Sequence, residues 1–192
     1  NNNKKLVLFL DYLNHDCYRV IGKEISIVNF FKAYRNQGFR FIFFQRIGFF
    51  YKRNLFLKFL SKIMTRHYCY KFGFQIPITT KIGKGVYFSH FGTVVINEDA
   101  VIGENCNINH NITIGRQNRG TKKGSPIIGN FVWLGTGCVI VGNITIGNNV
   151  LIAPNSYVNF NVPSNSVVMG NPGKILENEN ATEGYINKIL QK

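Results

Sequence analysis

The chain contains four histidines, and two of them recur at equivalent points of a repeating pattern. His90 lies two residues after Phe88, and His110 lies two residues after Ile108. A neutral imidazole titrates near neutral pH and is a common general base for removing a hydroxyl proton. The pair therefore indicates proton-transfer chemistry. The other two histidines lie in a separate basic segment, where we expect surface or packing roles: His15 and His67.

A six-residue repeat in the second half of the chain positions this pair. A six-residue period fits neither an amphipathic helix nor a hairpin meander, and it predicts a parallel β-helix of short strands and turns. The fourth residue after each large apolar position is small or β-branched, which makes Cys106 and Cys138 core residues. Thirteen positions carry the large apolar side chain: Ile76, Ile82, Phe88, Ile96, Ile102, Ile108, Ile114, Ile128, Leu134, Ile140, Ile146, Ile152 and Val158.

The register of the repeat places the two histidines together. The step from Phe88 to Ile96 is eight residues instead of six, and we count it as one rung. Three rungs, or one coil of a triangular helix, then separate Phe88 from Ile108. Both histidines occupy the same corner on successive coils, about 5 Å apart. Two histidines at equivalent corners favour a functional site over two solvated turn residues.

The repeat is interrupted again between Ile114 and Ile128, which are fourteen residues apart. The excess is rich in glycine and basic residues and contains no aliphatic side chain until its end. Such a stretch does not fit in the wall of a β-helix. Residues 115–127 are therefore predicted to form a protruding loop beside the histidines, and solenoids commonly carry function on such loops.

The first 75 residues differ from the rest in composition. They hold 14 basic and three acidic residues and are rich in Phe and Tyr, so we place a boundary near Gly73–Pro77. Apolar and basic residues at helical spacing predict helices over Ile25–Tyr34, Phe39–Tyr51 and Leu55–Tyr70. Their apolar faces are expected to pack on the β-helix. A second interpretation is contact with an anionic membrane surface; no motif supports a nucleic-acid partner.

Composition excludes several classes of protein. The chain has 192 residues, 45% hydrophobic and 17% charged, which excludes a disordered chain. Its four cysteines are widely spaced and form no Cys-x-x-Cys motif, which fits a reducing compartment. The apolar stretch Leu6–Leu10 is too short for a signal peptide, and no run is long enough for a membrane span. Residues 177–192 are expected to form a helical tail.

Residues 76–176 resemble the hexapeptide-repeat acyltransferases, in the branch of serine acetyltransferases and their polysaccharide O-acetyltransferase relatives. The resemblance implies a mainly β fold, a left-handed parallel β-helix with an α-helical N-terminal segment. It also implies acetyl-CoA as co-substrate without a metal, bound in a groove between subunits of a homotrimer or a dimer of trimers. Six segments carry it: Lys81-Ile-Gly-Lys-Gly85, Ser89-His-Phe-Gly-Thr93, Val95-Ile-Asn-Glu98, Ile112-Thr-Ile-Gly115, Gly142-Asn-Ile-Thr-Ile-Gly147 and Gly170-Asn-Pro-Gly-Lys174.

The resemblance assigns roles to particular residues. His90 matches the catalytic histidine of the serine acetyltransferases, and His110 resembles the histidine of the sugar-acetylating branch, so the two roles could be reversed. Two positions where the serine enzymes carry an Asp and a second His are occupied here by Gln75 and Ser125. Glu98 or Glu104 could orient a histidine, although exposed turn carboxylates are the simpler interpretation. Trp133 resembles an acceptor-site tryptophan, or else packs against a neighbouring subunit.

Two sets of residues are expected to bind acetyl-CoA. Small residues at rung turns would let the pantetheine arm approach the backbone. Lysines would meet the phosphates, with solvated charge as an equal alternative for those in the loop. The turn residues are Gly135, Thr136, Ala153 and Pro154, and the lysines are Lys174, Lys122 and Lys123.

The expected function is acetyl transfer from acetyl-CoA to a sugar hydroxyl of a cell-surface polysaccharide or its precursor. The loss of both charged positions, at Gln75 and Ser125, favours this over the alternative, a serine O-acetyltransferase. A non-catalytic β-helix scaffold is a second alternative. The expected location is cytoplasmic, with the basic helices on the inner face of the membrane.

Overall fold

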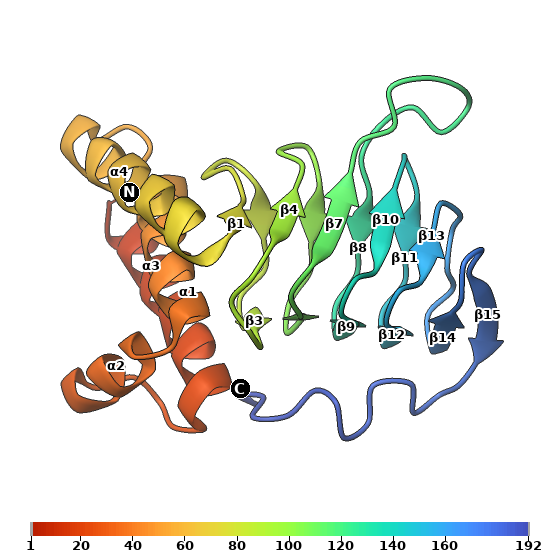
Figure 1. Ribbon diagram of the computed structural model, residues 1–192. Helices are drawn as coiled ribbons and strands as arrows, with labels where there is room; N and C mark the ends of the chain where they lie inside the picture. Colours follow the sequence, from red (N-terminus) through yellow and green to blue (C-terminus); the bar gives the residue numbers. More distant parts are fainter. Residues whose placement is uncertain (1, 192) are drawn as a thin grey trace.

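The structure, a computed structural model, describes residues 2–191 and places four helices against one end of a parallel β-helix (Figure 1). Asparagine and serine side chains start three of the helices, where Ser26, Asn36 and Asn54 each accept a hydrogen bond from a first-turn backbone N–H. Gly73 ends the last helix in a left-handed conformation, with φ 78°. The helices are α1 (Asn2–Ile21), α2 (Ile27–Tyr34), α3 (Gln37–Phe50) and α4 (Leu55–Phe72).

The sequence predicted the last three helices to within a few residues but missed α1. This helix has large apolar side chains on its exposed face as well as its buried one, with Leu6, Val7, Leu8 and Leu10 all exposed. An apolar stripe of helical period is therefore hard to see in its sequence.

The β-helix consists of three sheets, and each coil adds one strand to each sheet. We name them sheets A, B and C in chain order. All neighbouring strands are parallel, apart from the last pair of sheet C. Sheet A contains β1 (Phe74–Gln75), β4 (Val94–Ile96), β7 (Ile112–Gly115), β10 (Val139–Val141) and β13 (Tyr157–Val158). Sheet B contains β2 (Lys81–Ile82), β5 (Val101–Ile102), β8 (Ile127–Ile128) and β11 (Thr145–Ile146). Sheet C contains β3 (Tyr87–Phe88), β6 (Asn107–Ile108), β9 (Val132–Leu134), β12 (Val150–Ile152), β14 (Ser166–Met169) and β15 (Lys174–Glu177).

The predicted repeat is confirmed by the core. All thirteen large apolar positions are buried and stack in register, as where Phe88 pairs with Ile108 and Ile108 with Leu134. Cys106 and Cys138 are fully buried, as their place in the repeat predicted. Stacking each aliphatic side chain on the equivalent residue of the next coil removes the whole column from water, and this burial stabilises the fold.

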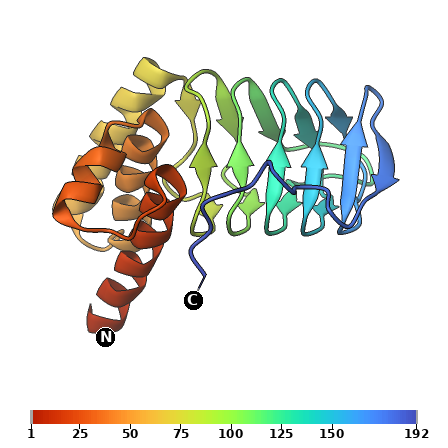
Figure 2. The same ribbon diagram turned by 90° about the horizontal axis from the view of Figure 1, so that it is seen from below.

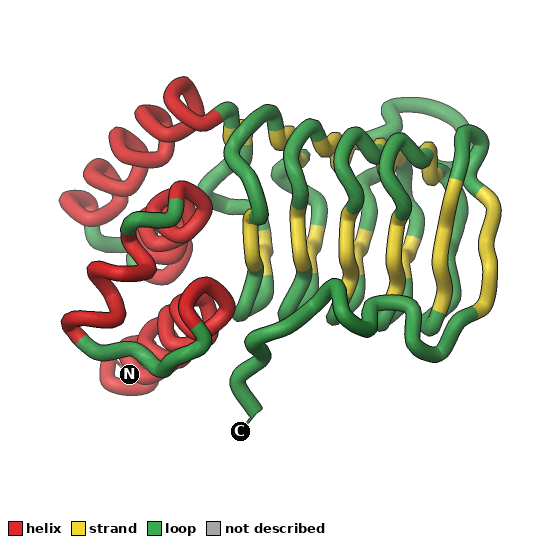
Figure 3. Tube along the Cα trace, turned by 60° about the horizontal axis from the view of Figure 1, so that its bottom comes forward, coloured by secondary structure: helices red, strands yellow, loops and turns green. Residues whose placement is uncertain are grey.

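The C-terminal segment is not helical, and the expectation of a helical tail is wrong. The strand β15 pairs antiparallel with β14, and the chain then returns across sheet C toward the helices (Figures 2 and 3). Asparagine and glycine turns favour this path, with Gly184 at φ 75°. The tail is held at Tyr185, whose carbonyl accepts a hydrogen bond from Asn107 Nδ2 at 2.9 Å, and at Lys188, which donates to the Val20 carbonyl at 2.9 Å.

A buried ion pair joins the helices to the first coil of the β-helix. Arg46 of α3 donates from Nε to Asp16 Oδ2 of α1 at 3.0 Å, and both side chains are buried. The same guanidinium donates to the backbone carbonyls of Ile82 and Gly83. Asp16 in turn accepts a hydrogen bond from the backbone N–H of Gly85 at 2.8 Å. The pair thus satisfies polar backbone groups at the edge of the first coil, which has no coil beneath it.

We predict that Arg46→Met lowers the free energy of unfolding by about 3–5 kcal/mol, because it leaves the Asp16 carboxylate buried without its partner. Urea denaturation followed by circular dichroism measures this loss. The matched control is Arg116→Met, which breaks an exposed pair with Asp99 and should cost less than about 1 kcal/mol. Equal losses in the two variants would contradict the role of the buried pair in satisfying the polar backbone groups of the first coil.

We also predict that thiol reagents at pH 8 modify one cysteine of the folded chain. Burial raises the pKa of Cys106 and Cys138 to about 12, and burial with the nearby Asp16 raises that of Cys17 to about 11. A raised pKa leaves very little reactive thiolate at pH 8. Cys69 on α4 is only half-buried. Mass spectrometry should find label on Cys69 alone in the folded chain and on all four cysteines in urea; native labelling of Cys106 or Cys138 would contradict this packing.

Candidate active site

The two repeat histidines lie side by side on one edge of the β-helix. We call the turns that join sheet C to sheet A the C–A edge. The His90 and His110 rings are on successive coils of this edge, with centroids 5.6 Å apart and planes at 87°. The predicted juxtaposition is confirmed, because β3 pairs with β6 in the register that aligns Phe88 with Ile108.

Hydrogen bonds fix the residues that precede each histidine. Ser89 Oγ donates to Asn109 Oδ1 at 2.6 Å, and Asn109 Nδ2 donates to the Leu134 carbonyl at 2.7 Å. Asn111 then adopts φ 59°, a left-handed conformation that asparagine tolerates in tight turns. Three coils are thus tied together at the corner that carries the imidazoles.

The eight-residue step makes the His90 corner wider than the His110 corner. Its extra residues leave His90 exposed, whereas His110 is half-buried. Gly92 lies in this corner at φ 143°, and a Cβ atom on it would meet His110 Cβ at 3.0 Å. The backbone N–H of Gly92 donates to the carbonyl of Phe72 at 2.9 Å, which ties the corner to the end of α4.

One ring nitrogen of the inner histidine lacks a hydrogen-bond partner among the described residues. Within residues 2–191, Nδ1 of His110 is buried without a hydrogen-bond partner. A buried imidazole nitrogen normally has a partner, so this atom is a candidate to contact a ligand or a neighbouring subunit. The adjacent rings could exchange a proton with a substrate at the surface while one holds the other in place.

The small turn residues expected to meet pantetheine continue the same edge. Gly137 N–H donates to the His110 carbonyl at 3.3 Å, and Asn155 N–H donates to the Thr136 carbonyl at 2.9 Å. Gly135 and Ala153 therefore follow the histidines coil by coil. A Cβ on Gly135 would come within 2.6 Å of the Pro154 nitrogen, so close stacking by itself requires glycine here.

The basic loop lies on a different edge, and the expectation that it sits beside the histidines within one chain is wrong. It connects β7 of sheet A to β8 of sheet B, so it leaves the edge that joins those two sheets, which we call the A–B edge (Figure 1). Lys122 Nζ donates to the Asn159 carbonyl at 2.5 Å, while Lys123 is exposed. Counting residues showed that the loop protrudes but did not show from which edge.

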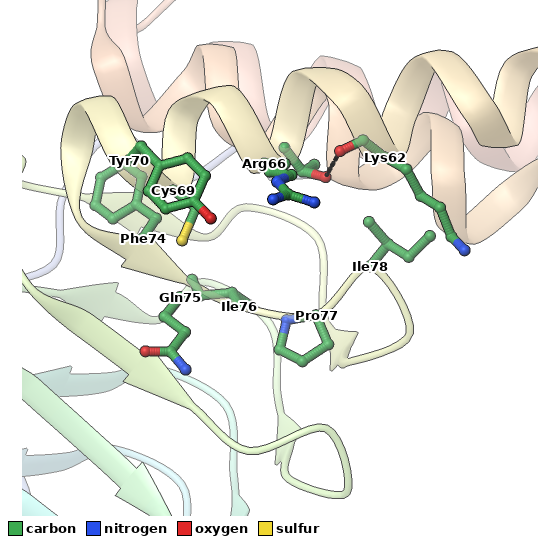
Figure 4. A pocket seen from close by; sticks show the side chains of 10 residues that line it. Lys62, Arg66, Cys69, Tyr70, Phe74, Gln75, Ile76, Pro77 and Ile78 are labelled. Carbon is green, nitrogen blue, oxygen red and sulfur yellow. Dashed lines mark hydrogen bonds between the residues drawn. The ribbon is translucent and has the colours of Figure 1, made fainter.

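The two positions that depart from the serine enzymes lie on different parts of the β-helix. Ser125 Oγ donates to Asn97 Oδ1 at 2.9 Å on the A–B edge. Gln75 is exposed on β1, in a groove of about 390 Å³ between α4 and the first strand that Lys62 and Arg66 also line (Figure 4). Ser125 is thus on another edge than the histidines, whereas Gln75 pairs with Val95 on the strand that follows the His90 corner.

The remaining candidates lie on other parts of the β-helix. Trp133 is on the outer face of sheet C and packs against Tyr185 of the tail, with centroids 4.9 Å apart, so its neighbour is this chain's own tail. Lys174 is exposed on β15. Glu98 and Glu104 lie in turns of the other two edges, where neither is placed to orient a histidine of the same chain.

Among the side chains of the described residues, no group of three or more His, Cys, Asp and Glu could hold a metal ion.

The comparisons with known proteins agree with this architecture. Residues 125–159 match the family described as bacterial transferase hexapeptide (six repeats). Serine acetyltransferase 4 of Arabidopsis thaliana is 42% identical over 105 residues, which are 55% of this chain and 30% of that protein. The serine acetyltransferase of Staphylococcus aureus is 38% identical over 112 residues, 58% of this chain and 53% of the relative. The solved serine acetyltransferase of Brucella abortus in complex with coenzyme A superposes with a TM-score of 0.73 and 25% identity, over 91% of this chain and 73% of that one.

The fold, the repeat and these matches all fit the hexapeptide-repeat acyltransferases that the sequence segments resemble. Within that class the chain is similar to serine acetyltransferases, and it spans about a third to a half of the length of the curated relatives. The matches favour the serine enzymes over the polysaccharide enzymes that the sequence analysis preferred.

We predict that Gly92→Ala displaces the His110 ring, because the added methyl group meets its Cβ. NMR signals of the His90 and His110 rings should both shift. The matched control is Gly184→Ala in the tail, where φ is also positive but no atom lies within 4 Å of the added carbon. Both variants should lose about 1 kcal/mol of stability from the backbone conformation. Unchanged ring signals in Gly92→Ala would contradict the packing of this corner.

Proposed function

We propose that the protein is an acetyl-CoA-dependent serine O-acetyltransferase that uses the paired histidines to deprotonate its acceptor. The observation that carries the proposal is the His90–His110 pair on the edge of a hexapeptide β-helix, 5.6 Å between ring centroids. The similarity to serine acetyltransferases supports the choice of acceptor, and the relative solved with coenzyme A supports the donor.

The reaction needs one proton acceptor and a hydrogen-bond donor for the oxyanion. His90, which is exposed, takes the hydroxyl proton as the serine oxygen attacks the thioester carbonyl. Backbone N–H groups of the C–A edge stabilise the resulting oxyanion. The intermediate collapses with cleavage of the C–S bond, and the imidazolium returns the proton to the CoA sulfur. His110 holds the His90 ring in place from the next coil.

The residues expected to bind CoA suggest a site completed by a second copy of the chain. The histidines, Gly135 and Ala153 lie on the C–A edge, whereas Lys122 and Lys123 lie on the A–B edge. In a homotrimer, the A–B edge of one chain would face the C–A edge of the next. The groove between them would hold the pantetheine arm along the small residues and the phosphates near the loop lysines.

The supply of acetyl-CoA argues for a cytoplasmic location. The four free cysteines of the chain fit a reducing compartment. The expected contact of the basic helices with the inner face of the membrane concerns a separate surface and does not depend on the choice of acceptor.

A sugar hydroxyl is the second candidate acceptor. Gln75 and Ser125 are uncharged, and charged side chains at those positions would suit the ammonium and carboxylate of free serine. A neutral hydroxyl of a polysaccharide or its precursor does not need charged side chains at these two positions.

Release of CoA with L-serine, and separately with a panel of sugars, distinguishes the two acceptors. We predict release with L-serine, and a fall of about 10²–10⁴-fold in His90→Ala, because the hydroxyl would lose its base. His110→Ala should reduce the rate less. His67→Ala, an exposed histidine on α4, is the control and should leave the rate unchanged.

Other outcomes would revise the proposal in defined ways. Release with sugars alone would transfer it to the second acceptor. An undiminished rate in His90→Ala would remove His90 from the mechanism. No acetyl-CoA binding by calorimetry would leave a non-catalytic scaffold.

A further inference from the structure

The outward side of α4 carries large apolar side chains that are exposed and lie outside the hydrophobic core cluster. We call it the α4 outer face and define it by five residues that are 81%, 73%, 64%, 48% and 76% exposed. These residues are Leu55, Phe56, Phe59, Ile63 and Tyr70, in that order.

Their spacing places four of them on one side of the helix. Phe56, Phe59, Ile63 and Tyr70 follow one another at intervals of three, four and seven residues, which keeps them on one side of a helix. The opposite side is already packed: Ser61 is buried, and its Oγ donates to the Phe44 carbonyl of α3 at 2.7 Å. The helix therefore cannot turn the stripe inward without losing its own packing.

The charge around this face has one sign. The helix α4 carries Lys58, Lys62, Arg66 and Lys71, and Lys52 and Arg53 precede it. No Asp or Glu occurs between Glu24 and Glu98.

The start of α1 adds to this positive charge. Lys5 and Leu6 line a groove with Arg53 and Leu57 beside the first turn of α4. The first acidic residue of α1 after Lys5 is Asp11, and its carboxylate forms a salt bridge with Lys84 at 2.9 Å. A partner that covers the stripe must therefore be anionic as well as apolar.

We infer that the α4 outer face docks on the surface of an anionic lipid bilayer. Phenyl and aliphatic groups enter the acyl boundary while ammonium and guanidinium groups meet lipid phosphates. A second copy of the chain is a poorer partner, because two such faces would bring like charges together without a carboxylate between them. None of the described helices is long and apolar enough to cross a bilayer, so the contact is interfacial.

Docking by α4 would also place the histidine corner near the membrane. The last residue of α4 is Phe72, whose carbonyl accepts the N–H of Gly92, two residues from His90. This inference rests on the helix surface alone and stands independently of the acceptor.

The test is co-sedimentation of the full chain with vesicles of phosphatidylcholine and phosphatidylglycerol, compared with vesicles of phosphatidylcholine alone. We expect binding to the anionic vesicles that weakens as salt is added. The variant Phe56→Ser/Phe59→Ser/Ile63→Ser should bind at least about tenfold more weakly, through lost apolar burial. Lys58→Gln/Lys62→Gln should bind about tenfold more weakly, through lost phosphate contacts.

The controls change exposed aliphatic and basic residues on the β-helix. Ile127→Ser/Leu176→Ser removes two exposed aliphatic side chains, and Lys81→Gln/Arg119→Gln removes two exposed charges. Both should bind like the unaltered chain, and circular dichroism should show all variants folded.

Three results would overturn the inference. One is equal binding to the two kinds of vesicle. Another is unaltered vesicle binding by the Phe56/Phe59/Ile63 variant. The third is an unaltered chain that does not bind the vesicles but forms an oligomer in light scattering, with the Phe56/Phe59/Ile63 variant dissociating that oligomer. A second copy of the chain would then cover the face.

Discussion

Parallel stacking of one coil directly on the next is the constraint on which the rest of the structure depends. Backbone pairing holds β3 over β6, and this register alone brings His90 above His110. Because equivalent residues stack, a side chain placed once per coil becomes a column along an edge. The same geometry lines up Gly135 and Ala153 after the histidines, so that one edge combines imidazoles with closely approachable backbone.

A β-helix also has open ends, and the two ends of this one are closed differently. At the first coil, the buried Arg46–Asp16 pair supplies donors and acceptors to backbone that would otherwise be unpaired. At the last coil, β15 turns back and pairs antiparallel with β14. A buried ion pair is costly to desolvate, and its value here lies in orienting α1 and α3 on the first coil. The helices otherwise pack on the first coil through apolar side chains, with Phe41 of α3 against Phe74 and Phe88, while α4 keeps its apolar outer face exposed.

Sequence reasoning recovered what a strict period encodes and missed what depends on three-dimensional context. The thirteen buried positions, both core cysteines and the histidine juxtaposition followed from counting in sixes. Helix α1 was missed because its exposed face is also apolar, and the tail was misjudged because its turns have no period. The edge that carries the basic loop depends on which sheet β7 joins. Sequence spacing also did not separate Ser125, which lies on the A–B edge, from Gln75, which lies on β1 of sheet A.

The most direct test of the account is a crystal structure of the protein soaked with coenzyme A. The account predicts that the CoA sulfur lies against the His90–His110 pair, with the pantetheine arm along the turns at Gly135 and Ala153. It also predicts that a second chain forms the other wall of the groove. Coenzyme A bound on another face, or histidine rings turned away from the sulfur, would contradict the central claim that these paired imidazoles form the active site.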